Sequence, residues 1–213
     1  MPLSAELEKL SEWVRRLPEI GMNTLGGAGT PMCVLDFVMI GAVKRSLSLA
    51  SGLLGMLQAR NMVCSRALLR MQLDTVTRVL AYTYVADPEG MARAIIGGKQ
   101  LRKFKSVDGK PLTDAYLVER LSHQHLWVKQ VYESTSGYVH FSECQFFDSV
   151  HSMSGDDDRM MTLQVSHIDN KFPEESWLEI AAYFNHLSEI LVSILHSYQA
   201  HKAANPALAG DAQ

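Results

Sequence analysis

Four charged residues at intervals of four could place a guanidinium group beside a phosphate. Arg66, Arg70, Asp74 and Arg78 follow one another in a segment otherwise rich in Leu, Val and Met. On an α-helix each interval advances about 400°, so the row forms a single polar stripe. Arg70–Asp74 and Asp74–Arg78 pairs leave Arg66 with spare charge. The stripe predicts either a solvent-facing row of weak ion pairs or a guanidinium fork that binds phosphate.

His140 is the residue best suited to acid–base chemistry, because imidazole titrates near neutral pH. It follows a run of hydroxyl-bearing side chains: Tyr132, Ser134, Ser136 and Tyr138. In the catalytic interpretation Arg70 holds a phosphate, Asp74 orients Arg70, and His140 transfers the proton. The alternative is a hydrogen-bonded structural histidine at the end of a helix.

Positive charge is concentrated in the middle of the chain, although the net charge is −3. Residues 60–110 carry ten basic and four acidic groups, net +6, whereas residues 111–213 carry five basic and fourteen acidic groups, net −9. RNA or another polyanion could bind the positive segment through Arg66 and Lys103, with Tyr138 as a further contact. Alternatively, the two segments face each other within one chain or across a dimer.

Patterns typical of metal and nucleotide sites are missing from the sequence. His140, Cys144 and Asp148 are four residues apart, but a closed zinc site needs four ligands and no Cys-x-x-Cys pair is present. The chain has no P-loop, dinucleotide-binding glycine motif or nucleophile elbow. We therefore expect neither a metal nor a cofactor. Three widely spaced cysteines also argue against a disulfide framework.

Apolar residues at three- and four-residue intervals predict helices over residues 4–17, 31–60, 62–85 and 114–135, and a last helix that begins near residue 173. Pro18 should end the first helix and Gly137 the fourth. Gly41, Gly52 and Gly55 predict a close approach of another backbone to the second helix. Together these elements predict a mainly α fold, a helical bundle.

One segment shows the alternation of a β-strand. Apolar Met161, Leu163 and Val165 are separated by polar residues, and residues 147–152 could pair with them across a turn. This predicts a small β-hairpin appendage within residues 145–168. The expected organisation is an N-terminal helix and Gly-rich loop over 1–30, a bundle domain over 31–202, and a disordered tail over 203–213.

The N-terminus lacks the basic and apolar regions of a signal peptide. The longest uncharged stretch of the second helix, residues 46–59, is too short to cross about 30 Å of hydrocarbon. We expect a cytoplasmic protein that does not enter a membrane.

Four segments together resemble a widespread family of uncharacterised bacterial proteins with a HEPN-like helical core. They lie within residues 35–150: Lys44-Arg45-Ser46-Leu47-Ser48-Leu49, Leu68-Leu69-Arg70-Met71-Gln72-Leu73-Asp74, Gly109-Lys110-Pro111-Leu112-Thr113-Asp114-Ala115-Tyr116-Leu117, and Tyr132-Glu133-Ser134-Thr135-Ser136-Gly137-Tyr138-Val139-His140-Phe141-Ser142. The resemblance implies a helical bundle, usually a homodimer. It implies either metal-independent RNA cleavage in phage defence or a stress response, or an inactive scaffold or sensor.

The resemblance makes His140 the motif histidine. Active HEPN proteins carry an Arg five to seven positions earlier, where this chain has Glu133, Ser134 and Thr135. Arg70 or Arg66 would have to supply the guanidinium group from the third helix.

Three weaker patterns complete the set of candidate functional residues. Arg120 and His125 have the Arg-x4-His spacing of the HEPN ribonuclease motif, away from the Tyr-Val-His segment. Three histidines of the last helix, at positions 186, 196 and 201, are scattered. Met71, Tyr82 and Trp127 could line a small-molecule pocket, or simply belong to the core.

Overall fold

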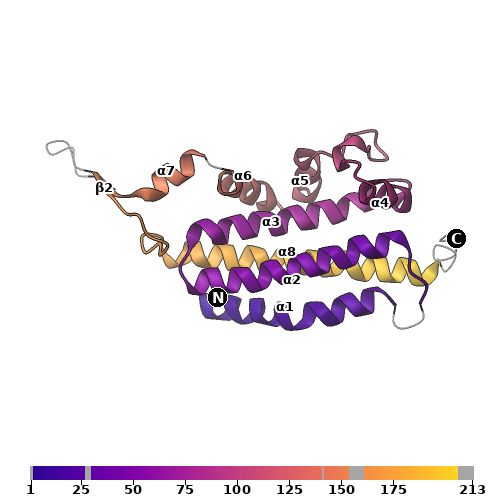
Figure 1. Ribbon diagram of the computed structural model, residues 1–213, viewed down its shortest axis with the longest axis horizontal. Coiled ribbons are helices and arrows are strands. Elements are labelled where there is room, and N and C mark those ends of the chain that lie inside the picture. The colour runs from indigo at the N-terminus through magenta and orange to yellow at the C-terminus, as the bar shows by residue number, and fades with distance from the viewer. Residues whose placement is uncertain (1, 27–29, 141, 154–160, 206–213) are drawn as a thin grey trace.

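The computed structural model describes residues 2–26, 30–140, 142–153 and 161–205, and within these ranges the chain is mainly helical. Four long helices run along the molecule: α1 (Leu3–Thr24), α2 (Val34–Gln58), α3 (Met62–Leu80) and α8 (Glu174–Ala204). They pack in the cyclic order α1–α2–α3–α8, with α2 running opposite to the other three (Figure 1). The prediction of a mainly α helical bundle is confirmed.

Shorter elements between α3 and α8 cover one side of α3 (Figure 1). They are the 3₁₀ turn η1 (Ala81–Tyr84), α4 (Pro88–Ile96), the 3₁₀ turn η2 (Leu101–Lys103), α5 (Asp114–Ser122) and α6 (Trp127–Val139). The predicted helix over 114–135 is thus two helices, and Gly137 lies inside α6. The prediction that Gly137 ends the helix is wrong.

An arm projects from one end of the bundle (Figure 1). It begins with α7 (Glu143–Ser149) and continues with β1 (Val150–Met153) and β2 (Met161–Leu163), which pair antiparallel. The expected strand over 147–152 therefore starts later, because α7 occupies the first part of it. The turn of the predicted hairpin lies outside the described residues, so the hairpin as a whole stays a prediction.

The core is formed by the apolar faces of the four long helices together with α4, α5 and α6. Its largest fully buried side chains include Trp177 and Phe184 of α8 and Leu10 and Leu17 of α1. α1 thus shares the core of the bundle. It also continues through Pro18 to Thr24, since burial of Leu17 and Gly21 offsets the one helical hydrogen bond that proline removes.

The glycines of α2 do not mark close packing. A Cβ atom at Gly41 or Gly55 would meet nothing within 4 Å, and at Gly52 it would make ordinary contact with Leu68. The close approach is instead at Gly21 of α1, where a Cβ would lie 3.0 Å from Val43. The expectation from the three α2 glycines is therefore wrong.

The start of α2 and the end of α8 also depart from expectation. The second helix begins at Val34, not at Pro31, and two carboxylates cap its first turn. Asp36 accepts a hydrogen bond from the Cys33 backbone N–H at 2.8 Å, and Glu89 of α4 accepts from Val34 and Leu35. At the C-terminus α8 extends through Ala204, into the tail predicted to be disordered, and residues 206–213 lie outside the described part.

Within the described residues, α2 and α8 are long and apolar enough to cross a membrane by length and composition alone. Both are core helices of the bundle, and core helices of soluble proteins pass the same test. The absence of membrane contact stays a prediction.

Candidate functional site

Arg66, in the second turn of α3, is held between two aromatic rings. Its guanidinium carbon lies 4.8 Å from the centroid of the Tyr138 ring and 4.9 Å from that of Phe172, and the guanidinium donates to the Tyr138 hydroxyl. Tyr138 donates in turn to Asp148 of α7 at 2.8 Å. Burial, followed by the bond to Asp148, raises the pKa of Tyr138 above its ordinary value. Arg66 forms no ion pair within the described residues.

Arg70, one turn further along α3, is almost completely buried. Only 7% of the residue is exposed, its guanidinium pairs with Asp74, and its guanidinium carbon lies 4.2 Å from the centroid of the Tyr132 ring. The next residue of the row, Arg78, pairs across to Asp114 at 3.2 Å. Most of the row is therefore engaged by groups of the chain itself.

His140 and Lys103 are exposed residues on other elements than Arg66 and Arg70. His140 is an exposed residue directly after α6, and its backbone carbonyl accepts a hydrogen bond from Gln145. Lys103 is exposed in η2, which follows α4 at the opposite end of α3 from Arg66 (Figure 1). Within the described residues, no hydrogen bond or ion pair joins either side chain to Arg66 or Arg70.

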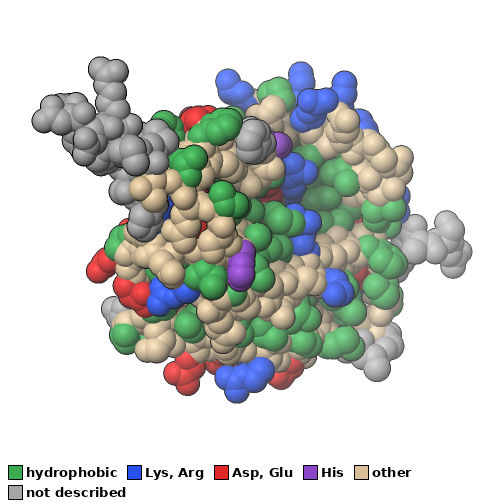
Figure 2. All heavy atoms as spheres, turned by 60° about the vertical axis from the view of Figure 1, so that its left-hand side comes forward, with side chains coloured by type: hydrophobic (Ala, Val, Ile, Leu, Met, Phe, Trp, Pro, Cys, Tyr) green, Lys and Arg blue, Asp and Glu red, His purple; other side chains and the backbone are tan. Residues whose placement is uncertain are grey.

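Lys and Arg side chains gather along the upper edge of the face in Figure 2, above a surface on which apolar side chains are frequent. The Arg66–Tyr138 contact, in contrast, is partly buried.

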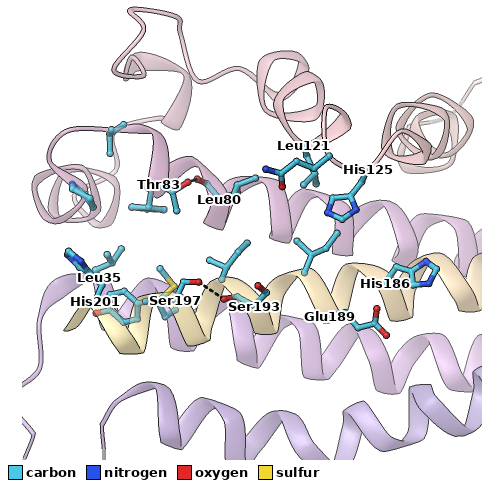
Figure 3. A pocket seen from close by; sticks show the side chains of 18 of the residues that line it. Leu35, Leu80, Thr83, Leu121, His125, His186, Glu189, Ser193, Ser197 and His201 are labelled. Atoms are coloured by element: carbon cyan, nitrogen blue, oxygen red, sulfur yellow. Dashed lines mark hydrogen bonds between the residues drawn. The ribbon is translucent and has the colours of Figure 1, made fainter. Parts of the chain in front are cut away.

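A groove of about 900 Å³ runs along α8, and we call it the α8 groove (Figure 3). Its walls come from α2, the end of α3, η1, the start of α4, the α5–α6 connection and α8. The lining residues are Leu35, Met39, Leu80, Tyr82, Thr83, Val85, Pro88, Leu121, Gln124, His125, Trp127, His186, Glu189, Ile190, Ser193, Ile194, Ser197, Tyr198 and His201.

The α8 groove is apolar along its middle because one stripe of α8 faces it. Ile190 and Ile194 are only partly buried and lie one turn apart. Leu121 and Leu80 lie across the groove from α8 (Figure 3). A second row of α8, with Ser193 among its members, borders the groove with polar side chains. The helix thus supplies an apolar floor and a polar rim at successive positions of its 3.6-residue period.

One end of the groove is aromatic and polar. The Trp127 ring stacks on Tyr183 with a centroid distance of 5.0 Å, and the His125 and His186 rings lie 6.1 and 6.0 Å from it. Glu189 projects from α8 at this same end (Figure 3). Imidazole and indole rings from two separate segments, residues 125–127 and α8, therefore lie close together at this end, and Glu189 lines the groove beside them.

The other end is bounded by Tyr198, whose hydroxyl group is tied into a buried cluster. It donates to Asp36 at 2.8 Å and lies 3.0 Å from the Cys33 sulfur, while Lys202 donates to Asp36 at 2.7 Å. Burial, followed by the bonds to Cys33 and Asp36, raises the pKa of Tyr198. Burial likewise raises the pKa of the Cys33 thiol. Hydrogen bonds to buried groups therefore fix the position of the Tyr198 hydroxyl at this end of the groove.

The contacts within the groove suit binding better than catalysis. The Ser197 hydroxyl donates to the Ser193 carbonyl, as a helical serine commonly does. Within the described residues, no hydrogen bond joins a groove serine to a groove histidine, and no three His, Cys, Asp or Glu side chains gather as metal ligands. A nucleophile needs a base within hydrogen-bond reach, which this arrangement does not provide.

Sequence reasoning found part of this groove. Tyr82 and Trp127 line it as proposed, whereas Met71 does not. His125 lines it too, while Arg120 pairs with Asp108 at 3.6 Å, so the Arg-x4-His pair is divided between two environments.

Sequence reasoning did not identify the polar row of α8, because it treated His186 and His201 as scattered. Its members recur at three- and four-residue steps, which is the signal that could have identified them: His186, Glu189, Ser193, Ser197 and His201.

Comparison with protein-family models, curated proteins and solved structures finds no match for this chain. The HEPN-like relationship, the homodimer and the cytoplasmic location therefore stay predictions.

Proposed function

We propose that this protein is a non-catalytic sensor or carrier that binds an elongated, largely apolar small molecule in the α8 groove. The groove itself carries the proposal. Its volume of about 900 Å³ lies in the range of small-molecule sites, about 300–1,000 Å³, and such sites are mostly apolar with a few polar groups.

The shape of the groove favours an elongated ligand. Its α8 wall extends from His186 to His201, a length of about 22 Å at 1.5 Å per residue. Polar groups cluster at the Trp127 end and along the rim, whereas Leu80, Leu121 and Ile190 line the middle. A molecule with an apolar chain and one polar end would match this distribution.

A fluorescent probe tests the proposal. N-phenyl-1-naphthylamine is uncharged and apolar, and its emission rises when it leaves water, so we expect saturable enhancement with the purified protein. Ser193→Trp would fill the groove from an exposed rim position and should abolish the enhancement. Ser51→Trp, at an exposed position of α2 outside the groove, is the matched control and should bind normally. Equal binding by both variants would exclude the groove as the site.

An RNA-directed activity is the second candidate. The first support is Arg66, which has no carboxylate partner among the described residues. The second is His140, an exposed residue two positions after Tyr138, the tyrosine that contacts Arg66. In this proposal His140 takes the proton of a ribose 2′-hydroxyl while a guanidinium group stabilises the phosphate.

The RNA proposal predicts that the purified protein degrades RNA in the presence of a metal chelator and that His140→Ala abolishes the degradation. His123→Ala, at an exposed histidine after α5, serves as control. Wild-type protein that leaves cellular RNA intact would contradict this candidate and leave the groove proposal unaffected.

A further inference from the structure

The residues that line the α8 groove include few permanently charged side chains. Of its lining residues only Glu189 carries a permanent charge, and none is Lys or Arg. An anionic head group in the groove would meet no fixed positive charge and one negative charge. A cationic or neutral head group meets no such penalty.

Glu189 has the surroundings of a cation-binding carboxylate. It lies on the same face of α8 as His186, one turn away, and the His186 ring is 6.0 Å from the Trp127 ring. Within the described residues Glu189 forms no ion pair and no hydrogen bond. Its charge is therefore uncompensated at the end of an apolar groove.

Trp127 adds a second attraction for positive charge. Indole is the aromatic side chain that binds cations most strongly through its ring face, and the effect grows as water is excluded. Tyr183 stacks on Trp127 at 5.0 Å, which holds the indole in place. Two histidines, His125 and His186 (Figure 3), lie beside the indole ring.

We propose that the groove selects cationic amphiphiles: molecules with an apolar chain along Leu121 and Ile190 and an ammonium head between Glu189 and Trp127. This inference rests on the proposed groove function and adds to it the charge of the ligand. It assigns Glu189 as the residue that determines specificity.

Three ligands with the same ten-carbon chain test the charge selectivity: decyltrimethylammonium, 1-decanol and decanoate. Each is used below its micelle concentration to displace N-phenyl-1-naphthylamine at pH 8, where an ordinary imidazole is uncharged. We expect decyltrimethylammonium to bind about five- to tenfold more tightly than decanol, from one ion pair and one cation–π contact. Decanoate should bind most weakly.

Glu189→Gln should reduce the preference for decyltrimethylammonium over decanol to the part that Trp127 supplies, and should leave the affinity for decanol unchanged. Glu175→Gln, an exposed carboxylate in the first turn of the same helix, is the control and should change neither. Because both positions are exposed, the variants are expected to fold, which their melting temperatures verify.

The outcomes separate the two proposals. Decanol or decanoate binding as tightly as the ammonium ligand, or a Glu189→Gln variant that keeps the full preference, would overturn the charge selectivity while the groove function stands. A wild-type protein that binds neither the probe nor any of the three ligands would overturn the groove function itself.

Discussion

Asp36 and Lys202 form the most deeply buried ion pair among the described residues, with side chains 0% and 7% exposed. Burial opposes ionisation of Asp36, but hydrogen bonds from Lys202, the Cys33 backbone and Tyr198 outweigh it and hold its pKa below the ordinary value. The pair joins the start of α2 to the end of α8. A buried pair contributes little net free energy, yet removal of one partner leaves a desolvated charge.

Lys202→Met should therefore lower the free energy of unfolding by about 3–5 kcal/mol, measured by urea denaturation. Arg16→Met removes one partner of an exposed pair, Arg16–Glu12 at 3.3 Å, and should cost less than about 1 kcal/mol. Asp36→Asn combined with Lys202→Met should recover much of the loss, because no charge is then buried alone and the amide oxygen can still accept a hydrogen bond. Equal losses for Lys202→Met and Arg16→Met would show that the buried charge is not the cause.

Helix α6 continues through Gly137 because the glycine makes room for the start of the arm. A Cβ atom there would lie 2.5 Å from the Ser142 hydroxyl oxygen and 2.9 Å from the Cys144 sulfur. Ser142 precedes α7 and donates to the Gly137 carbonyl. The lack of a side chain at Gly137 thus allows α6 and the start of α7 to pack closely, and it does not end α6.

Gly137→Ala should lower the free energy of unfolding by about 1–2 kcal/mol, since the clash with Ser142 exceeds the gain in helix propensity. Gly41→Ala, in the interior of α2 where a Cβ meets nothing within 4 Å, should raise it by about 0.5–1 kcal/mol. Urea unfolding of the two variants compares them directly. If both variants are stabilised, the α6–α7 junction is looser than its contacts indicate.

At the scale of the whole molecule, ionised carboxylates are built into the contacts between distant helices. Glu6 of α1 is 3% exposed and accepts a hydrogen bond from Asn185 of α8 at 2.8 Å. Burial opposes its ionisation, but the bonds from Asn185 and Lys9 prevail, so its pKa is lowered from the ordinary 4.5. The pKa of Asp36 is lowered from 3.8. Both helix–helix contacts need the charged form.

Because the folded pKa values lie below the unfolded ones, the unfolded chain binds protons more readily in acid. The stabilisation by both groups is complete above about pH 4.5 and is lost as the pH falls below 4.5 for Glu6 and 3.8 for Asp36. Urea unfolding between pH 6 and 3 should show this decline, less steeply for Glu6→Gln. Glu8→Gln, at an exposed position of the same helix, should keep the wild-type slope. A wild-type slope in Glu6→Gln would argue against the lowered pKa.

The helices themselves were predictable because helix formation depends on local spacing. Trp177, Ile180 and Phe184 keep one face of α8 apolar in the sequence, and all three are buried. The ends of helices were less predictable, because they depend on partners far along the chain. Glu89 of α4 caps the start of α2. No sequence pattern around residue 34 predicts this cap.

The sequence alone determined that this protein is a mainly helical bundle with an uneven charge distribution, since periodicity and composition are properties of neighbouring residues. Only the tertiary structure decided which polar residues are available to a ligand. Arg70 is buried against Tyr132, whereas Glu189, which no motif singled out, stands at the end of a groove. The physical reason is that burial and cavities arise where separate segments pack against one another. The α8 groove forms where residues near 35, 80, 121 and 190 come together, and no local sequence pattern predicts that contact.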